Sequence, residues 1–251
     1  MTDRVVLALT GADRVDFLQG LVTNNVAGAD GSLVYAALLT PQGKYLADFF
    51  ILNQPDRILI DVAASHAAGL LQRLTMYRLR ADVQITQTDI TVSRGTGPAP
   101  KGAIADPRNA ALGWRFYGDK DVSDQTDWDA LHVTYLVPQT GLELHPEAYI
   151  LEAGFERLHG VDFRKGCFVG QEIVARMKHK ATLRKGLVRV TVDGAAQPGD
   201  EILSGDRVTG TVHTVAGDQA IAYLRFDRTN DMRTTGARLT PHPGDIPEDM
   251  Q

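Results

Sequence analysis

Cys167, the only cysteine of this 251-residue chain, lies in a segment whose residue types could do chemistry. A thiol acts as a nucleophile or a metal ligand only as the thiolate, which nearby cations and a helix N-terminus stabilise. Arg164 and Lys165 come just before it, and from Gly170 the apolar spacing predicts a helix, whose first turn favours an anion by ~0.3–1 kcal/mol. A lone cysteine is more often a small buried hydrophobe, but these neighbours favour a reactive thiol.

Asp48 is a second candidate, because it interrupts an apolar run that predicts a strand over residues 45–52. A turn at residues 40–43 precedes this strand, so we expect it to pair with a strand over residues 33–39 as a hairpin. Alternation along a strand can place a charged side chain on the solvent face. The pattern alone favours that interpretation for Asp48.

The residues around Cys167 also resemble a family signature. The run KGCFVGQE, from Lys165 to Glu172, followed by Arg176, is similar to that of the YgfZ-like folate-binding proteins. That family belongs to the superfamily of the glycine-cleavage aminomethyltransferase and takes part in iron-sulfur cluster assembly or repair. Phe168 stands where tyrosine is commoner, which keeps the ring. Similar segments occur in order along the chain, at residues 11–25, 41–51, 106–115 and 151–155.

The resemblance implies roles for individual residues. Asp48 matches an aspartate that contacts the reactive edge of folate, and Glu152 matches a glutamate that holds the pterin ring in the aminomethyltransferases. A carboxylate suits this task because it accepts hydrogen bonds from two ring N–H groups, each worth ~1.5–3 kcal/mol when dry. We therefore expect a tetrahydrofolate cofactor that binds between the hairpin of Asp48 and the segment of Glu152. The expected binding residues are Asp48, Glu152, Lys165, Gln171 and Arg176, and the expected catalytic residues are Cys167 and Asp48.

The function implied by the resemblance is that of a tetrahydrofolate-binding accessory protein in iron-sulfur cluster assembly or repair. Its partners would be reduced folate and iron-sulfur assembly or client proteins. The alternative is folate-dependent aminomethyl transfer, which Asp48 and Glu152 would serve, so independent turnover is left open. A cysteine hydrolase with His159 or His179 as its base is a weaker alternative, because seven histidines make such a pairing easy by chance.

The charge of the chain is unevenly distributed. The net charge is −5, yet residues 164–185 contain seven Lys or Arg against Glu172 alone. This basic strip is either a solvated face or a site for an anion such as a polyglutamate tail, a phosphate or a nucleic acid. Only Phe163 and Phe168 lie among these charges, so stacking on bases is weak and we expect no tRNA binding.

The composition, 43% hydrophobic, is typical of a soluble globular chain. No apolar run approaches the ~20 residues of a membrane span, and the N-terminus lacks the long apolar centre of a signal peptide. One cysteine forbids an internal disulfide and a four-cysteine iron-sulfur site within one chain, and no His/Cys spacing suits zinc. We therefore expect a cytoplasmic protein with no membrane span and no metal site of its own.

The order of predicted elements indicates an α+β fold with antiparallel sheets, because it leaves little room for parallel crossovers. We expect strands over residues 5–9, 33–39, 45–52, 57–62, 83–87 and 90–93, and helices from about residue 13 and over residues 67–76. A loop is expected over residues 93–101, and a helix after a capping box of Thr126 and Asp129. We expect Arg108 and Arg115 to form structural ion pairs.

Beyond residue 185 the pattern changes to short strands separated by frequent turn signals, which indicates a small antiparallel β-barrel. We expect the tail from residue 241 to be disordered. The chain is thus predicted to have two domains, with an aminomethyltransferase-like fold as the resemblance implies. Residues 1–183 would form a folate-binding module of two intertwined α+β parts, and residues 184–251 the barrel domain with a flexible tail.

Overall fold

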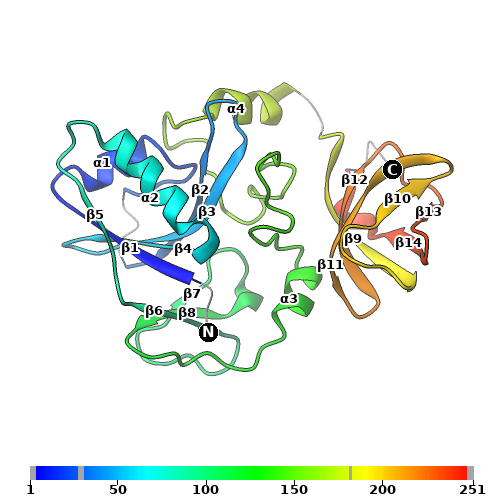
Figure 1. The fold of residues 1–251 in the computed structure, drawn as a ribbon, viewed down its shortest axis with the longest axis horizontal. Helices are drawn as coiled ribbons and strands as arrows, with labels where there is room; N and C mark the ends of the chain where they lie inside the picture. Colours follow the sequence, from blue (N-terminus) through cyan, green and yellow to red (C-terminus); the bar gives the residue numbers. More distant parts are fainter. Residues whose placement is uncertain (1–3, 28–30, 181–182, 248–251) are drawn as a thin grey trace. The chain divides into compact units, whose positions relative to one another are not determined.

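The computed structural model describes residues 4–27, 31–180 and 183–247, and Figure 1 shows its ribbon. The side chain of Lys180 lies outside this description. The contacts divide the chain into two compact units. Unit 1 consists of residues 1–126 and 155–173, and unit 2 of residues 127–154 and 174–251. Residues 127–154 group with the residues of the barrel, so these units do not correspond to a single cut in the sequence. The predicted domain boundary between residues 183 and 184 therefore stays a prediction.

Unit 1 is built on a five-stranded antiparallel sheet with the strand order β2-β3-β4-β1-β5 (Figure 1). As predicted, β2 and β3 pair as a hairpin across a tight turn. The strands are β1 (Arg4–Thr10), β2 (Leu33–Leu39), β3 (Tyr45–Asn53), β4 (Ile58–Ala63) and β5 (Gln84–Gln87).

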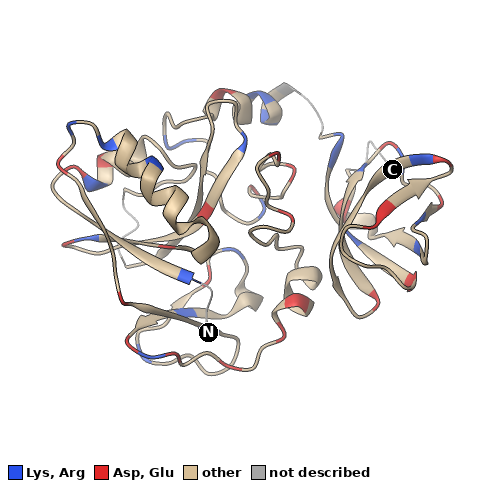
Figure 2. Cartoon of the chain, in the orientation of Figure 1, with Lys and Arg blue, Asp and Glu red and all other residues tan. Residues whose placement is uncertain are grey.

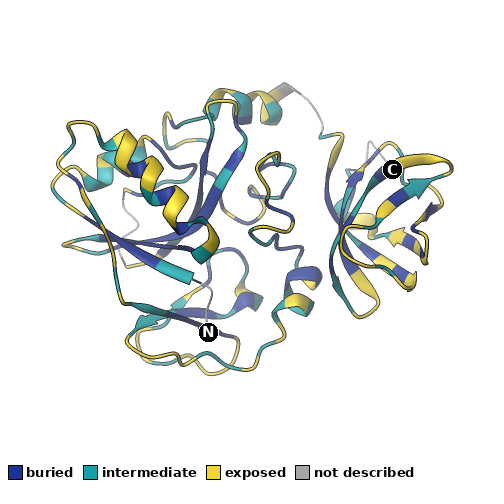
Figure 3. Ribbon diagram, in the orientation of Figure 1, coloured by how far each residue is buried: buried dark blue, intermediate teal, exposed yellow. Residues whose placement is uncertain are grey.

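Two helices follow the first and fourth strands, α1 (Arg14–Gln19) and α2 (Ala64–Arg78). α2 lies across one face of the sheet (Figure 1), where Ala67, Leu70 and Leu74 join the strand residues in one buried core. The predicted helical spacing identified these inward residues, although the helix is longer than predicted. The outer face of α2 is exposed (Figure 3).

A second sheet of unit 1 contains three short antiparallel strands in the order β6-β8-β7. They are β6 (Thr91–Gly95), β7 (Ile104–Ala105) and β8 (Trp114–Gly118), and the 3-10 helix η1 (Ala110–Leu112) precedes β8. The predicted loop over residues 93–101 is therefore wrong at its start, which lies inside β6. No strand was predicted for β7 or β8, because these segments are too short to show alternation.

Unit 2 contains α3 (Trp128–Thr134) and a closed β-barrel with the strand order β10-β11-β12-β9-β14-β13. The barrel encloses its own apolar core, and its existence is as predicted. Its strands are β9 (Lys185–Gly194), β10 (Glu201–Ser204), β11 (Arg207–Ala216), β12 (Gln219–Arg225), β13 (Met232–Arg233) and β14 (Ala237–Pro241).

Two predictions for unit 2 are wrong. Asp127 caps α3 by accepting a hydrogen bond from the backbone N–H of Ala130, so the capping box of Thr126 does not form. The tail is ordered beyond residue 241, since η2 (Pro243–Asp245) follows β14 and Arg189 binds the carboxylate of Asp245 at 2.8 Å. Residues 248–251 of the predicted flexible tail lie outside the described residues.

The helix predicted after Cys167 is α4 (Gln171–Lys180), which begins one residue after Gly170. Figure 2 marks the basic residues that this helix contributes to the basic strip. Within the described ranges, no helix is both long enough and apolar enough to cross a lipid bilayer.

Candidate functional site

Cys167 lies on a loop at residues 165–170 that leads into α4, and its side chain is exposed. The next residue, Phe168, is buried, and its carbonyl oxygen accepts a hydrogen bond from the backbone N–H of Gln171. The buried ring of Phe168 thus anchors the loop, while the thiol of Cys167 is exposed to solvent. The alternative that Cys167 is a packed core residue is wrong.

The loop is attached to the end of α1 through Lys165. The ammonium of Lys165 donates a hydrogen bond to the backbone oxygen of Gln19. The side-chain amide of Gln19 in turn donates to the backbone oxygen of Lys165 at 3.3 Å. The Lys165 Nζ atom also lies 5.2 Å from the centre of the Phe168 ring. The two hydrogen bonds between Lys165 and Gln19 hold the backbone beside Cys167 in one place.

Two glycines allow the hairpin turn between β2 and β3 to approach the start of α4. Gly170 has a φ of 84°, and a Cβ there would lie 2.6 Å from the backbone oxygen of Thr40. Gly43, in the hairpin turn, has a φ of 74°, and its Cβ would lie 2.8 Å from that of Ile173. Since real Cβ atoms do not come so close, both positions require glycine. The hairpin that bears Asp48 therefore also supports the loop of Cys167.

The electrostatic state of Lys165 is unusual. Burial lowers its pKa to about 8, against the negative charges of Asp162 and Cys167, which raise it. Desolvation of an ammonium favours the neutral amine. Lys165 is thus a half-buried cation within electrostatic reach of the Cys167 sulfur.

Asp48 is buried in the middle of β3, with only 4% of its surface exposed. The interpretation that strand alternation places it in solvent is wrong, because β3 is covered on both faces. Both carboxylate oxygens accept hydrogen bonds from phenols: Tyr35 donates to Oδ2 at 3.0 Å and Tyr45 to Oδ1 at 2.7 Å. Burial, followed by the charge of Asp48, raises the pKa of Tyr35 well above its ordinary value, so this phenol remains a donor.

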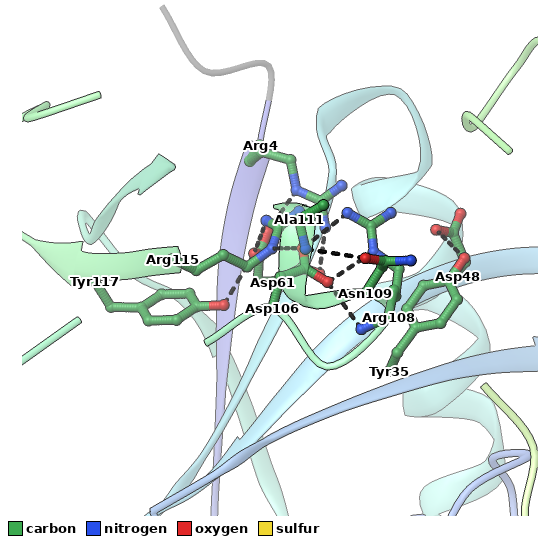
Figure 4. A network of polar contacts seen from close by, with 10 residues as sticks. All are labelled: Arg4, Tyr35, Asp48, Asp61, Asp106, Arg108, Asn109, Ala111, Arg115 and Tyr117. Atoms are coloured by element: carbon green, nitrogen blue, oxygen red, sulfur yellow. Dashed lines mark hydrogen bonds and ion pairs between the residues drawn. The ribbon is translucent and has the colours of Figure 1, made fainter. Parts of the chain in front are cut away.

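A buried network of ions lies beside Asp48 in unit 1 (Figure 4). Asp61 binds Arg4 and Arg115, and Asp106 binds Arg108 at 2.8 Å and Arg115 at 3.2 Å. The predicted structural ion pairs of Arg108 and Arg115 are confirmed. The part played by Arg4 and Asp61 was not predicted, since the two lie far apart in the sequence.

The same guanidinium groups surround the ring of Phe50, at 3.6 Å for Arg115, 4.8 Å for Arg108 and 5.5 Å for Arg4. Burial alone would raise the pKa values of Asp61 and Asp106, but the adjacent arginines hold both below the ordinary value. Both carboxylates are therefore ionised. The network packs against Phe50, on the strand that bears Asp48.

Glu152 lies in unit 2, and its side chain is largely buried. Its Oε2 atom accepts a hydrogen bond from the phenol of Tyr223, on β12, at 2.7 Å, and its Oε1 atom lies 3.9 Å from the ammonium of Lys185. Burial and then this hydrogen bond raise the pKa of Tyr223. The segment of Glu152 is thus fixed to the barrel through its side chain and through its backbone oxygen, which accepts a hydrogen bond from the N–H of Leu187 at 2.9 Å.

The predicted site residues fall into three groups. Lys165, Cys167 and Gln171 share one loop and the first residue of α4, and Asp48 lies elsewhere in unit 1. Glu152 and exposed Arg176 belong to unit 2. The phenols that bind the two carboxylates were missed, because strand residues reveal their partners only through register. Gln19 could have been found, since it lies in the segment 11–25 that resembles the family.

In the described part of the chain, no three His, Cys, Asp or Glu side chains gather as metal ligands would.

The chain is similar to several known proteins. Residues 184–247 match the family described as the CAF17 C-terminal beta-barrel domain. A solved structure, the glycine cleavage system aminomethyltransferase T of Bartonella henselae, superposes with a TM-score of 0.77 over 98% of this chain and 85% of that chain, at 13% identity. The fold is that of an aminomethyltransferase. The predicted fold class is confirmed, and at this identity the likeness concerns the fold alone.

Among the curated relatives are proteins named iron-sulfur cluster assembly factor IBA57, or its homolog. The protein of Mycosarcoma maydis is 32% identical over 78% of this chain and 57% of its own length. The mouse protein is 27% identical over 83% of this chain and 69% of its own length. The human protein is 29% identical over 74% of this chain and 64% of its own length. The chain spans little more than half the length of the fungal relative.

The expected cytoplasmic location is contradicted, because the names of these relatives describe them as mitochondrial. The expectation used a single cysteine and the lack of a secretory signal. These features separate reducing from oxidising compartments. They do not distinguish one reducing compartment from another.

Proposed function

We propose that this chain is an accessory factor in the assembly or repair of iron-sulfur clusters, with Cys167 as its reactive group. The observation that carries the proposal is the exposed thiol on a loop that Lys165 and Gly170 fix in place. The names of the relatives support the same role. One thiolate can receive, share or pass on sulfur or a cluster, but four ligands are needed to hold a cluster.

The second part of the proposal is that the chain binds tetrahydrofolate. The acceptor groups suit this cofactor, because Asp48 is buried, Glu152 is partly buried, and the oxygens of both carboxylates accept hydrogen bonds from phenols. A carboxylate oxygen has more than one lone pair, so each is proposed to accept from the N–H groups of a reduced pterin as well. Lys165, Gln171 and Arg176 are proposed to bind the rest of the cofactor, and the basic strip its glutamate tail.

The cellular role can be tested in a strain that lacks the protein. Expression of the full chain should restore the activity of endogenous iron-sulfur enzymes, while enzymes without clusters should remain unaffected in both strains. Restoration depends on cluster supply, so the clusterless enzymes are the matched control. Equal effects on both groups of enzymes would refute the assignment.

The folate part is tested separately by calorimetric titration of the purified protein with tetrahydrofolate. Glu152→Gln keeps the shape and the Tyr223 contact but removes the charge, so it should weaken binding roughly 10- to 150-fold, as expected for one dry charge-assisted contact of ~1.5–3 kcal/mol. Tyr223→Phe is the matched control for a disturbed segment and should weaken binding less. Unchanged affinity of a folded Glu152→Gln protein would remove Glu152 from the site.

A second candidate function is folate-dependent aminomethyl transfer. The observation that favours it is Asp48, a buried hydrogen-bond acceptor on the strand that the resemblance links to the reactive edge of folate. The two functions differ in their dependence on Cys167. Transfer of a one-carbon unit from an aminomethyl donor to tetrahydrofolate that survives Cys167→Ser would favour the transferase.

A further inference from the structure

The C-terminal end of α2 presents apolar side chains to solvent beside arginines. Met76 is 69% exposed and Leu79 is 89% exposed, and Tyr77 is exposed as well. Arg73 lies on the same helical face as Met76 and Tyr77, and exposed Arg80 follows Leu79. Neither Arg73 nor Arg80 forms an ion pair with any residue that the structure describes. We name these five residues the α2-end patch.

The backbone at Leu79 has a conformation that leucine rarely adopts. Its φ is 45° and its ψ is −104°, and the backbone N–H of Ala81 donates to the oxygen of Arg78 at 2.8 Å. These angles and this hydrogen bond fit the first central position of a type II′ turn, which strongly prefers glycine. Leu79 is therefore both strained and almost fully exposed.

The strain persists because the following residues are fixed to another loop. The carboxylate of Asp13 accepts from the N–H of Asp82 at 2.8 Å, and the carboxylate of Asp82 accepts from the N–H of Ala12 at 3.1 Å. A Cβ at Gly11 would lie 2.1 Å from the oxygen of Asp82, so the two loops are in close contact. Val83 is buried directly after this point. These contacts fix the chain after the turn and so oppose its relaxation, which keeps Leu79 exposed.

We propose that the α2-end patch docks a partner protein whose surface has an apolar recess surrounded by Asp and Glu side chains. Glycine at position 79 would remove both the strain and the exposed apolar surface. A leucine there therefore stabilises the protein only when another surface covers its side chain. Exposed residues in strained conformations gather at binding sites, and arginine is enriched among the residues that dominate binding energy. Because the two arginines have no acidic partner within the described chain, they favour a partner whose recess is surrounded by acidic side chains.

This surface is independent of the proposed chemistry, since it uses neither Cys167 nor the two carboxylates. Its helical members lie on the outer face of α2, which Figure 3 shows as exposed, and Leu79 and Arg80 directly follow the helix. Met76 and Leu79 supply the apolar centre, and Arg73 and Arg80 the charged margin.

Photo-crosslinking of the full chain in cells tests the proposal. Leu79→p-benzoylphenylalanine should crosslink to a different protein, through a segment in which aliphatic residues lie among Asp and Glu. The combined change Arg73→Glu and Arg80→Glu should reduce this product at least tenfold. Leu142→p-benzoylphenylalanine is the matched control, because Leu142 is also an exposed leucine. No product above that control, a product with a second copy of this chain, or a product that survives charge reversal would overturn the proposal.

Leu79→Gly, with the crosslinked partner purified, separates binding from folding. This variant should bind at least roughly tenfold more weakly, while its Tm stays the same or rises because the turn is relieved of strain. A lower Tm would show that Leu79 is packed against the rest of the chain, and unchanged affinity would show that it is not part of the interface; either result overturns the docking role.

Discussion

Burial and nearby charge act in opposite directions on the pKa of Lys165, and burial has the larger effect. Its folded-state pKa of about 8 lies below the value of 10.5 that an exposed lysine has. Between these two values the unfolded chain binds more protons than the folded chain does. Stability therefore rises as the pH increases through this window. Below about pH 8 both states are protonated, and the burial penalty on the ammonium is present in full.

Lys165→Met should accordingly flatten the rise of Tm between pH 8 and pH 10, because the variant has no ammonium to desolvate at this position. Thermal denaturation at several pH values measures the slope. Lys101→Met is the matched control, since Lys101 is exposed and its replacement should leave the slope as it is. Parallel curves for the natural protein and Lys165→Met would contradict this account of the loop.

At the scale of the element, the loop of Cys167 depends on the close approach of the hairpin turn to α4. Gly170→Ala would bring a Cβ against the oxygen of Thr40, whereas a Cβ at Gly166, whose φ is 97°, meets nothing within 4 Å. Gly166→Ala thus measures backbone strain alone, about 1–3 kcal/mol. Gly170→Ala should lower the free energy of unfolding by more than that control and change the rate at which iodoacetamide alkylates Cys167. Equal losses of stability would mean that the packing of the turn contributes nothing.

The buried ion network supports the strand of Asp48 in the same unit. Arg115→Met leaves Asp61 and Asp106 without a shared cation, so it should destabilise the protein by about 3–5 kcal/mol. Arg225→Met removes an exposed ion pair with Asp227, which solvent screens, so its effect should be much smaller. Chemical denaturation compares the two variants. Similar effects would refute the structural role of the network.

The pH dependence of this network has a definite sign. The folded-state pKa values of Asp61 and Asp106 are lowered, so the stability that they contribute is present above the ordinary value of about 4 and disappears as the pH falls below it. Arg115→Met should therefore lose less further stability than the natural protein between pH 5 and pH 2.

The sequence predicts those elements whose cause is local. The helical spacing of Ala67, Leu70 and Leu74 identifies α2, the turn between β2 and β3 identifies the hairpin, and frequent turn signals identify the barrel. Asp48 shows what a local pattern misses. Its burial follows from elements that cover β3 on both faces, and its phenol partners follow from register.

At the scale of the whole molecule, the chain combines an aminomethyltransferase fold with a CAF17-type barrel, and it differs from a one-carbon enzyme in its proposed use of a thiol. The resemblance in sequence carried the functional prediction, because the fold alone serves several chemistries. The hydrogen bond from Tyr223 to Glu152 could not be predicted, since β12 is remote in sequence and reaches Glu152 only in the folded unit.

The central claim is that Cys167 is required for function and dispensable for folding. It is tested most directly by Cys167→Ser in the strain that lacks the natural protein, with iron-sulfur enzyme activity as the readout. Serine keeps the size of the exposed side chain and removes the soft, ionisable sulfur. We predict activity as low as in the strain without the protein, with the Tm and the tetrahydrofolate affinity of the purified variant unchanged. Full activity with Cys167→Ser would contradict the claim and assign the function to the carboxylates.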